Sequence, residues 1–366
     1  MPAETTRHDH DLHTAQIAAI FRAWGMGEQN ARLTGEVLGW ADLHGVESHG
    51  IAMIVEYDER RRTRPINMTP EPRIITERPT GALIDGDGGF GHVPANFAMR
   101  TAISKARESG LAAVTVRNSG HFGALGYFTG LAADAGLIGM ATTTVFGVRV
   151  APTGGRRPRF GTDPFSFAAP GSDGVPFLLD MATCTVASGK VRNKVVEQKP
   201  IPPGWGMDAN GLPTTDPAQV MQGGMLTSLG GTADGASHKG YGMAAMVNIL
   251  SSCLSGSTLI TDPMHTKQPW GLDVGHFFLA LDPGLFRDAG DVAADVSRFC
   301  NDLRTTEPVD PTQPVMVAGD PERRFRDDRM RNGVPLGDAM LRKLYEIAVR
   351  DGAEWLITRP EAQPTA

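Results

Sequence analysis

The chain has 366 residues, of which 41% are hydrophobic and 21% charged, as in a globular protein with one large or two medium domains. Its formal net charge of -6 gives no sign of a surface that binds nucleic acid or an anionic membrane. The three cysteines (Cys184, Cys253 and Cys300) lack CxxC spacing, which argues against a disulfide scaffold or zinc knuckle and favours a reducing compartment.

The N-terminal residues 1–13 are polar and lack the apolar region of a signal peptide. No apolar run in the chain reaches the roughly 18 residues that a membrane span needs. We therefore expect a cytoplasmic protein without a membrane partner. The histidines at positions 8, 10 and 13 could bind a metal or belong to a flexible polar tail, and we favour the tail.

Apolar residues recur at helical spacing twice in the first 50 residues, over 17–24 and over 33–41, and Gly45 can end the second helix. A basic, proline-containing link follows at 60–72. Strands and helices then alternate, which indicates an α/β core. In chain order they are a strand at 82–84, a helix at 93–108 ended by Gly110, a strand at 111–116, a helix at 123–135 and a strand at 137–145.

The second half of the chain opens with a segment rich in proline and glycine, 146–235. It contains apolar runs at 165–168 and 177–179, a helix over 183–195 and an irregular stretch at 200–217. An apolar helix (238–253), a strand (277–281) and two amphipathic helices (285–303 and 338–349) complete the chain. We expect a main α/β domain formed by 1–125 together with 235–366, and an inserted domain formed by 126–234.

The sequence GDGGFG at 86–91 satisfies the G-x-G-x-x-G pattern of a dinucleotide-binding turn. However, the following strand ends in Val116-Arg117-Asn118, where a Rossmann fold needs an acidic residue for the ribose hydroxyls. The repeated βαβ units of that fold are also missing from the segment rich in proline and glycine. We interpret the motif as a glycine turn that lets a helix pack closely.

Two histidine-containing segments are candidates for chemistry. The first, DLHGVESHG at 42–50, places Ser48 and His49 at a helix end between glycines, where an imidazole can exchange a proton near neutral pH. The alternative is a solvated histidine at a helix end. The second, VRNSGHFGALGYF at 116–128, carries His121 on a strand-to-helix turn, where ligands commonly bind.

Together with four further segments, these motifs resemble the malate/L-lactate dehydrogenase family, whose members do not use a Rossmann fold. The further segments are GTDPFSFAAP (161–170), LLDMAT (178–183), IPPGWGMDANGLPTTDP (201–217) and HKGYGMAAMVNIL (238–250), and the match extends from about residue 15 to about residue 350. The resemblance implies an α/β fold with a mixed sheet and helical N- and C-terminal parts, a homodimer, and NAD or NADP as cofactor. It also implies that the inserted domain binds this cofactor.

The resemblance carries residue roles onto this sequence. His49 matches the family's proton donor with Ser48 beside it, and His121 matches a histidine assigned as proton acceptor in one branch. The stretches that match cofactor-binding positions are Pro176, Phe177, Leu178, Leu179, Asp180, Met181 and Ala182, then His238 and Lys239, and finally Gly319, Asp320 and Pro321. No metal site is implied.

The residues of these stretches also suit the role by their chemistry. Asp180 ends an apolar strand, which suits ribose hydroxyls, but it could instead cap the helix at 183–195. Lys239 begins an apolar helix and could hold a phosphate, or it could be a surface lysine. The arginines in the loop at 154–159 could contact a 2′-phosphate, although a solvated basic loop is the simpler interpretation.

The sequence departs from the family at two positions. Met53 stands where many members have an arginine that would bind a substrate carboxylate, although some hydroxycarboxylate dehydrogenases share the methionine. Asp163 replaces the usual asparagine of a GTNP motif and adds a negative charge near the expected cofactor.

The expected activity is hydride transfer between a nicotinamide and C2 of a small 2-hydroxy or 2-keto acid. Three alternatives stay open: reduction of a cyclic imine such as Δ1-piperideine-2-carboxylate, a metal-dependent lyase or hydrolase that uses His44, His49 and His121, and a catalytically inactive nucleotide-binding protein.

Overall fold

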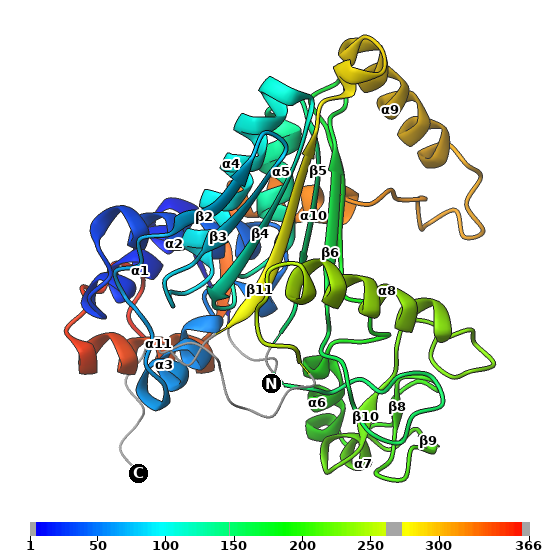
Figure 1. Ribbon diagram of the computed structural model, residues 1–366. Helices are drawn as coiled ribbons and strands as arrows, with labels where there is room; N and C mark the ends of the chain where they lie inside the picture. Colours follow the sequence, from blue (N-terminus) through cyan, green and yellow to red (C-terminus); the bar gives the residue numbers. More distant parts are fainter. Residues whose placement is uncertain (1–4, 146, 261–272, 361–366) are drawn as a thin grey trace.

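The computed structural model describes residues 5–145, 147–260 and 273–360. Its centre is a seven-stranded sheet in the order β2-β3-β4-β11-β5-β6-β7 (Figure 1). The strands are β2 (Arg73–Arg78), β3 (Gly81–Asp85), β4 (Leu111–Ser119), β5 (Ile138–Thr143), β6 (Phe165–Ala169), β7 (Phe177–Met181) and β11 (Val274–Leu281). Only β3 and β4 run parallel, whereas the other neighbours are antiparallel. The sheet is therefore mixed, as the resemblance implies.

Helices cover both faces of the sheet at its centre. α4 (His92–Ser109) and α5 (Leu125–Asp134) pack on one face, and α8 (His238–Asn248) with the π-helical η2 (Ile249–Cys253) lies on the other (Figure 1). Because β11 is covered on both sides, it is an almost continuous apolar run in sequence. Gly110, in the left-handed region at φ 79°, ends α4 as predicted.

The two ends of the chain form one helical layer beside the sheet. α1 (His10–Ala23), α2 (Glu28–Leu43), α3 (Met53–Thr63) and α11 (Asp338–Asp351) share a core, and β1 (Thr5–His8) pairs with β12 (Val334–Gly337). Figure 1 shows these N-terminal (blue) and C-terminal (red) helices side by side. The expectation of a flexible N-terminal tail is wrong, because His8 lies in a strand and His13 is fully buried.

A small lobe with its own apolar core lies beyond β7. It contains α6 (Ser188–Glu197), α7 (Pro217–Met221) and a three-stranded sheet of β8 (Gly206–Met207), β9 (Pro213–Thr214) and β10 (Met225–Leu226). The predicted insertion at 126–234 thus combines strands β5–β7, which extend the large sheet, with this lobe. The division of the chain into a main domain and an inserted domain stays a prediction.

The remaining elements lead to the C-terminal layer. They are η3 (Pro283–Leu285), α9 (Ala289–Arg304) and α10 (Asp320–Asn332), and the short η1 (Glu47–His49) follows α2. Neither α3 nor α10 is predicted from sequence, because both are dominated by charged residues without a clear apolar stripe. Residues 5–145, 147–260 and 273–360 contain no helix with the length and apolarity to cross a membrane.

Candidate active site

The segment with Ser48 and His49 is a tight turn between α2 and α3. Gly45, at φ 79°, ends α2, and η1 then presents Ser48 with its Oγ 2.8 Å from Nδ1 of His49. A side chain at Gly50 would overlap the carboxylate of Asp42, so this position requires glycine. The turn therefore places Ser48 at the surface and His49 in a half-buried position beside it.

Buried polar contacts fix this turn from below. Asp42 accepts the N–H of Ile51 at 2.6 Å and lies 2.8 Å from Nε2 of His13, a fully buried residue of α1. Arg329 of α10 donates to the Asp42 carbonyl and forms an ion pair with Glu47. Elements from both ends of the chain thus position the turn.

The second predicted histidine lies directly beside the first. His121 follows β4, and its carbonyl accepts the N–H of Gly91 at 3.0 Å. The rings of His49 and His121 stack with centroids 5.5 Å apart and an interplanar angle of 29°. Gly86 and Gly91 pack against the backbone around Gly120, as the interpretation of GDGGFG as a packing turn predicts.

A tyrosine that no sequence motif singled out lies within hydrogen-bond distance of His121. Tyr57 of α3 is fully buried, with its hydroxyl 2.6 Å from Nδ1 of His121 and 3.4 Å from Nε2 of His92. Tyr57 lies one helical turn after Met53 on the same buried face. That spacing was the only available signal, and it is also what an ordinary core tyrosine shows.

Burial dominates the electrostatics of this cluster. Burial lowers the pKa of His49, and the negative charge of nearby Glu56 partly offsets this by favouring the protonated ring. Burial, with additional repulsion from His49 and Arg60, holds the pKa of His121 well below its ordinary value. Burial also lowers the pKa of His92 to about 3 and raises that of Tyr57 far above its usual range. The cluster is therefore uncharged at neutral pH, and His49 and His121 are half-buried whereas His92 is fully buried.

Met53 belongs to the apolar core beneath the site and is 8% exposed. It offers no charge to a substrate. On α3, Arg60 forms an ion pair with Glu56, and its positive charge lowers the pKa of both His121 and Tyr57.

The stretch 176–182 forms β7 and its flanks, and Asp180 has a local partner. Its Oδ2 accepts the N–H of Gly126 at 2.7 Å, so this carboxylate caps the N-terminus of α5. Burial raises the pKa of Asp180 to about 6, although the backbone hydrogen bonds from Gly126 and Leu125 favour the ionised carboxylate. The capped helix is α5, which starts four residues after His121, and not the helix after β7 that the sequence suggested.

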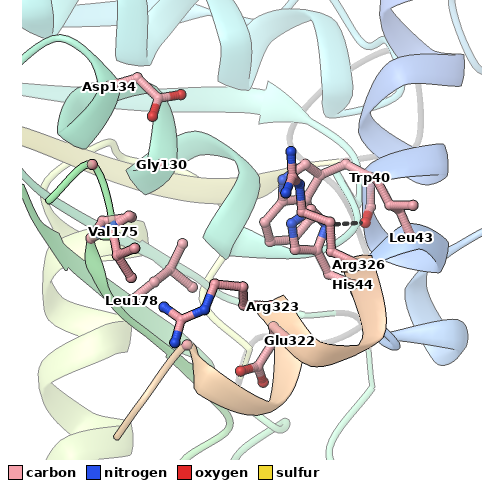
Figure 2. A pocket seen from close by; sticks show the side chains of 13 residues that line it. Trp40, Leu43, His44, Gly130, Asp134, Val175, Leu178, Glu322, Arg323 and Arg326 are labelled. Atoms are coloured by element: carbon pink, nitrogen blue, oxygen red, sulfur yellow. Dashed lines mark hydrogen bonds between the residues drawn. The ribbon is translucent and has the colours of Figure 1, made fainter. Parts of the chain in front are cut away.

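Pro176, Leu178 and Gly319 line one cavity of about 400 Å³, which brings two of the predicted cofactor-binding stretches together. Figure 2 shows its other walls: Trp40 and His44 from α2 and its end, and Glu322, Arg323 and Arg326 from α10. The Trp40 and His44 rings stack at 4.0 Å. Burial lowers the pKa of His44 to about 4, so the arginines supply the positive charge at this cavity.

Asp320 is occupied by structural contacts. Arg304 donates to both of its carboxylate oxygens at 2.9 Å, and Arg323 and the N–H of Val317 add further hydrogen bonds. Burial alone would raise the pKa of Asp320, but these donors lower it below its ordinary value. Asp320 thus shapes the loop before α10, and Pro321 occupies the first turn of that helix.

His238 and Lys239 are exposed at the N-terminus of α8. They do not line the cavity of Pro176 and Gly319. However, the start of α8, where they lie, is connected to the segment that follows β7. The link is Leu229, whose N–H donates to the Thr183 carbonyl at 2.8 Å and which packs against Gly240. The loop at 154–159 borders a different cavity, of about 280 Å³, through Gly154, Gly155 and Arg156.

Asp163 is fully buried, in the left-handed region at φ 37°. Its Oδ2 accepts the N–H of Gly161 at 3.1 Å, and the side chain of Asn248 is its other hydrogen-bonding neighbour. Burial raises the pKa of Asp163 to about 7. Across the described ranges, no group of three or more His, Cys, Asp or Glu side chains is arranged to hold a metal ion.

The family model for malate/L-lactate dehydrogenase matches residues 9–345. The chain is 37% identical to a malate dehydrogenase of Pyrococcus horikoshii over 341 residues, which cover 93% of this chain and 94% of that protein. It is equally similar (37% over 332 residues, 90% of each chain) to hydroxycarboxylate dehydrogenase B of Escherichia coli K12. The crystal structure of malate dehydrogenase from Entamoeba histolytica superposes with a TM-score of 0.90 at 31% identity, covering 96% of this chain and 99% of that one. The chain therefore belongs to the malate/L-lactate dehydrogenase family and is an oxidoreductase with that family's fold.

Proposed function

We propose that the protein transfers a hydride between a nicotinamide dinucleotide and C2 of a small 2-hydroxy or 2-keto acid. The observation that carries this proposal is the stacked pair of His49 and His121, which two separate motifs bring to one place. The names of the similar proteins, malate dehydrogenase and hydroxycarboxylate dehydrogenase, support the substrate class.

His49 is the proton-exchanging group in this proposal. Ser48 occupies its Nδ1 at 2.8 Å, which leaves Nε2 for the substrate oxygen. In the oxidation direction, neutral His49 takes the hydroxyl proton while the hydride leaves C2; in reduction, protonated His49 returns it. When bound, the nicotinamide supplies or accepts the hydride at its C4 carbon.

The cavity of Figure 2 fits part of a dinucleotide. Its volume of about 400 Å³ is that of a small-ligand site, and the N-terminus of α10 opens at Gly319 without a side-chain cap. Arg323 and Arg326 can pair with phosphate, and Asp134 and Glu322 can accept from ribose hydroxyls. Both charge types face the cavity, so it suits NAD and NADP alike.

We assign the substrate carboxylate to Arg60. Met53 is apolar, and Arg60 is the α3 cation whose charge reaches both Tyr57 and His121. Replacing Arg60 by Ala should raise KM for a 2-hydroxy acid at least tenfold, because a charge-assisted hydrogen bond is lost. Arg62 of the same helix, whose side chain is 61% exposed, provides the matched control.

His49→Ala tests the proposal. It should abolish turnover of 2-keto acids at 340 nm while NADH or NADPH still raises the melting temperature. No thermal shift with either nucleotide would overturn the proposal, and so would full activity of the variant. Assaying keto acids beside cyclic imines distinguishes the proposed reaction from imine reduction.

The resemblance also supports a homodimer in the cytoplasm. Light scattering after gel filtration measures the oligomeric state: a mass of twice 39.1 kDa is expected.

A further inference from the structure

The hydroxyl of Tyr57 lies between two imidazoles in an otherwise aromatic pocket. Its ring packs at 4.8 Å from Phe90 and 6.2 Å from Phe21, and the side chain is fully buried. The hydroxyl lies 2.6 Å from Nδ1 of His121 and 3.4 Å from Nε2 of His92. A buried hydroxyl at such a short distance from one ring nitrogen constrains where the protons of both groups are.

A second donor settles the direction of this hydrogen bond. The backbone N–H of Gly123 also points at Nδ1 of His121, at 3.3 Å. Because a peptide N–H can only donate, Nδ1 carries a lone pair, and Tyr57 must donate its proton to the same atom. A neutral imidazole with an accepting Nδ1 has its proton on Nε2.

The surroundings keep His121 in this neutral form. Burial is the main reason that the pKa of His121 lies well below its ordinary value, and the permanent positive charge of Arg60 also opposes a proton on the ring. His276 in turn bonds Ser119 and Thr143 through its two ring nitrogens, at 2.8 and 2.7 Å, and is held in place on β11.

We propose that Tyr57 is a positioning residue that fixes His121 as an Nε2–H donor, so that His121 hydrogen-bonds the substrate oxygen and does not take its proton. This rests on the proposed function. In oxidation, the hydroxyl proton moves to His49 and the hydride moves to the nicotinamide, whereas the proton on His121 stays in place. The role differs from the proton acceptor that the family resemblance implies for His121.

The hydrogen-bond role is tested by replacing the imidazole with an amide. His121→Gln keeps an N–H donor but cannot accept a proton, so it should retain activity within about tenfold of the wild type. His121→Ala should lose about 10²–10³-fold in kcat, as when an oxyanion donor is removed. If the Gln variant is as inactive as the Ala variant, His121 is a proton acceptor and the proposal is overturned.

The positioning role is tested on the ligand-free protein. Nitrogen-15 NMR of histidine-labelled enzyme should show His121 with its proton on Nε2, and Tyr57→Phe should release a mixture of tautomers and lower kcat about fivefold, with KM unchanged. Tyr345→Phe on α11 is the matched control and should change neither.

A proton on Nδ1 of His121 in the wild type, or an unchanged tautomer and kcat in Tyr57→Phe, would overturn the proposal. The tautomer is read without turnover. An enzyme that binds no nucleotide would therefore overturn the proposed function and leave this measurement valid.

Discussion

Asp42 accepts the backbone N–H of Ile51 at 2.6 Å, two residues beyond His49, and the same carboxylate oxygen lies 2.8 Å from the buried His13. One side chain thus joins the turn that carries the candidate proton donor to the first helix of the chain. The geometry of Ser48 and His49 depends on a buried polar contact that neither of them makes.

Asp42→Asn should therefore weaken both stability and activity. The amide keeps one oxygen that can accept from Ile51 and His13, but it lacks the negative charge that strengthens both contacts, and a hydrogen bond to a charged group contributes about 1.5–3 kcal/mol. Urea unfolding measures this loss. Asp328→Asn, which removes an exposed ion pair with Arg7, is the control and should leave the unfolding midpoint almost unchanged. Equal stability of the two variants would contradict the structural role of Asp42.

Gly50→Ala addresses the same turn through its backbone. The new methyl group would overlap the Asp42 carboxylate, so the turn must move and displace His49. A shift of about 1 Å at a catalytic group costs on the order of a hundredfold in rate, which steady-state kinetics will detect. In Gly242→Ala, where an added Cβ meets no atom within 4 Å, stability should be at least that of the wild type. A fully active Gly50→Ala enzyme would show that the turn tolerates movement.

The buried carboxyl of Asp163 predicts a pH-dependent stability. Burial raises its pKa to about 7, so the folded protein holds a proton that the unfolded chain releases near pH 4. Stability is therefore lost as the pH rises from about 4 to about 7. Asp163→Asn removes this loss, and its gain over the wild type should grow by roughly 2 kcal/mol between pH 5 and pH 8. Urea unfolding at both pH values tests this, and a gain independent of pH would mean that Asp163 stays ionised.

Local sequence patterns were sufficient for the main strands and helices and for the two histidine segments. The helix ended by Gly110 and the apolar run of β11 are short-range signals, and the structure has both. His49 and His121 were each recognised from their own motif, although only the fold shows that their rings stack.

The missed features depend on contacts between distant parts of the chain. Asp180 finds its partner at Gly126, which is 54 positions away, and Arg329 reaches Glu47 across 282 positions. Helix α10 is rich in charged residues and lacks a clear apolar stripe, so nothing in its own sequence indicates that it contacts the first half of the chain. Tyr57 was missed because its spacing from Met53 is that of any buried helix face.

The last prediction concerns the pH dependence of the reaction. Because burial lowers the pKa of His49 and Glu56 partly opposes this, oxidation should rise with pH to a plateau, with a midpoint below 6.5. Reduction should fall over the same range, since it needs the protonated ring. Glu56→Gln removes the opposing charge and should move the kcat/KM midpoint to a lower pH, whereas Glu59→Gln, on an exposed position of α3, should leave it in place. A midpoint that rises in Glu56→Gln would mean that another group titrates, and it would remove His49 from the proton-transfer step.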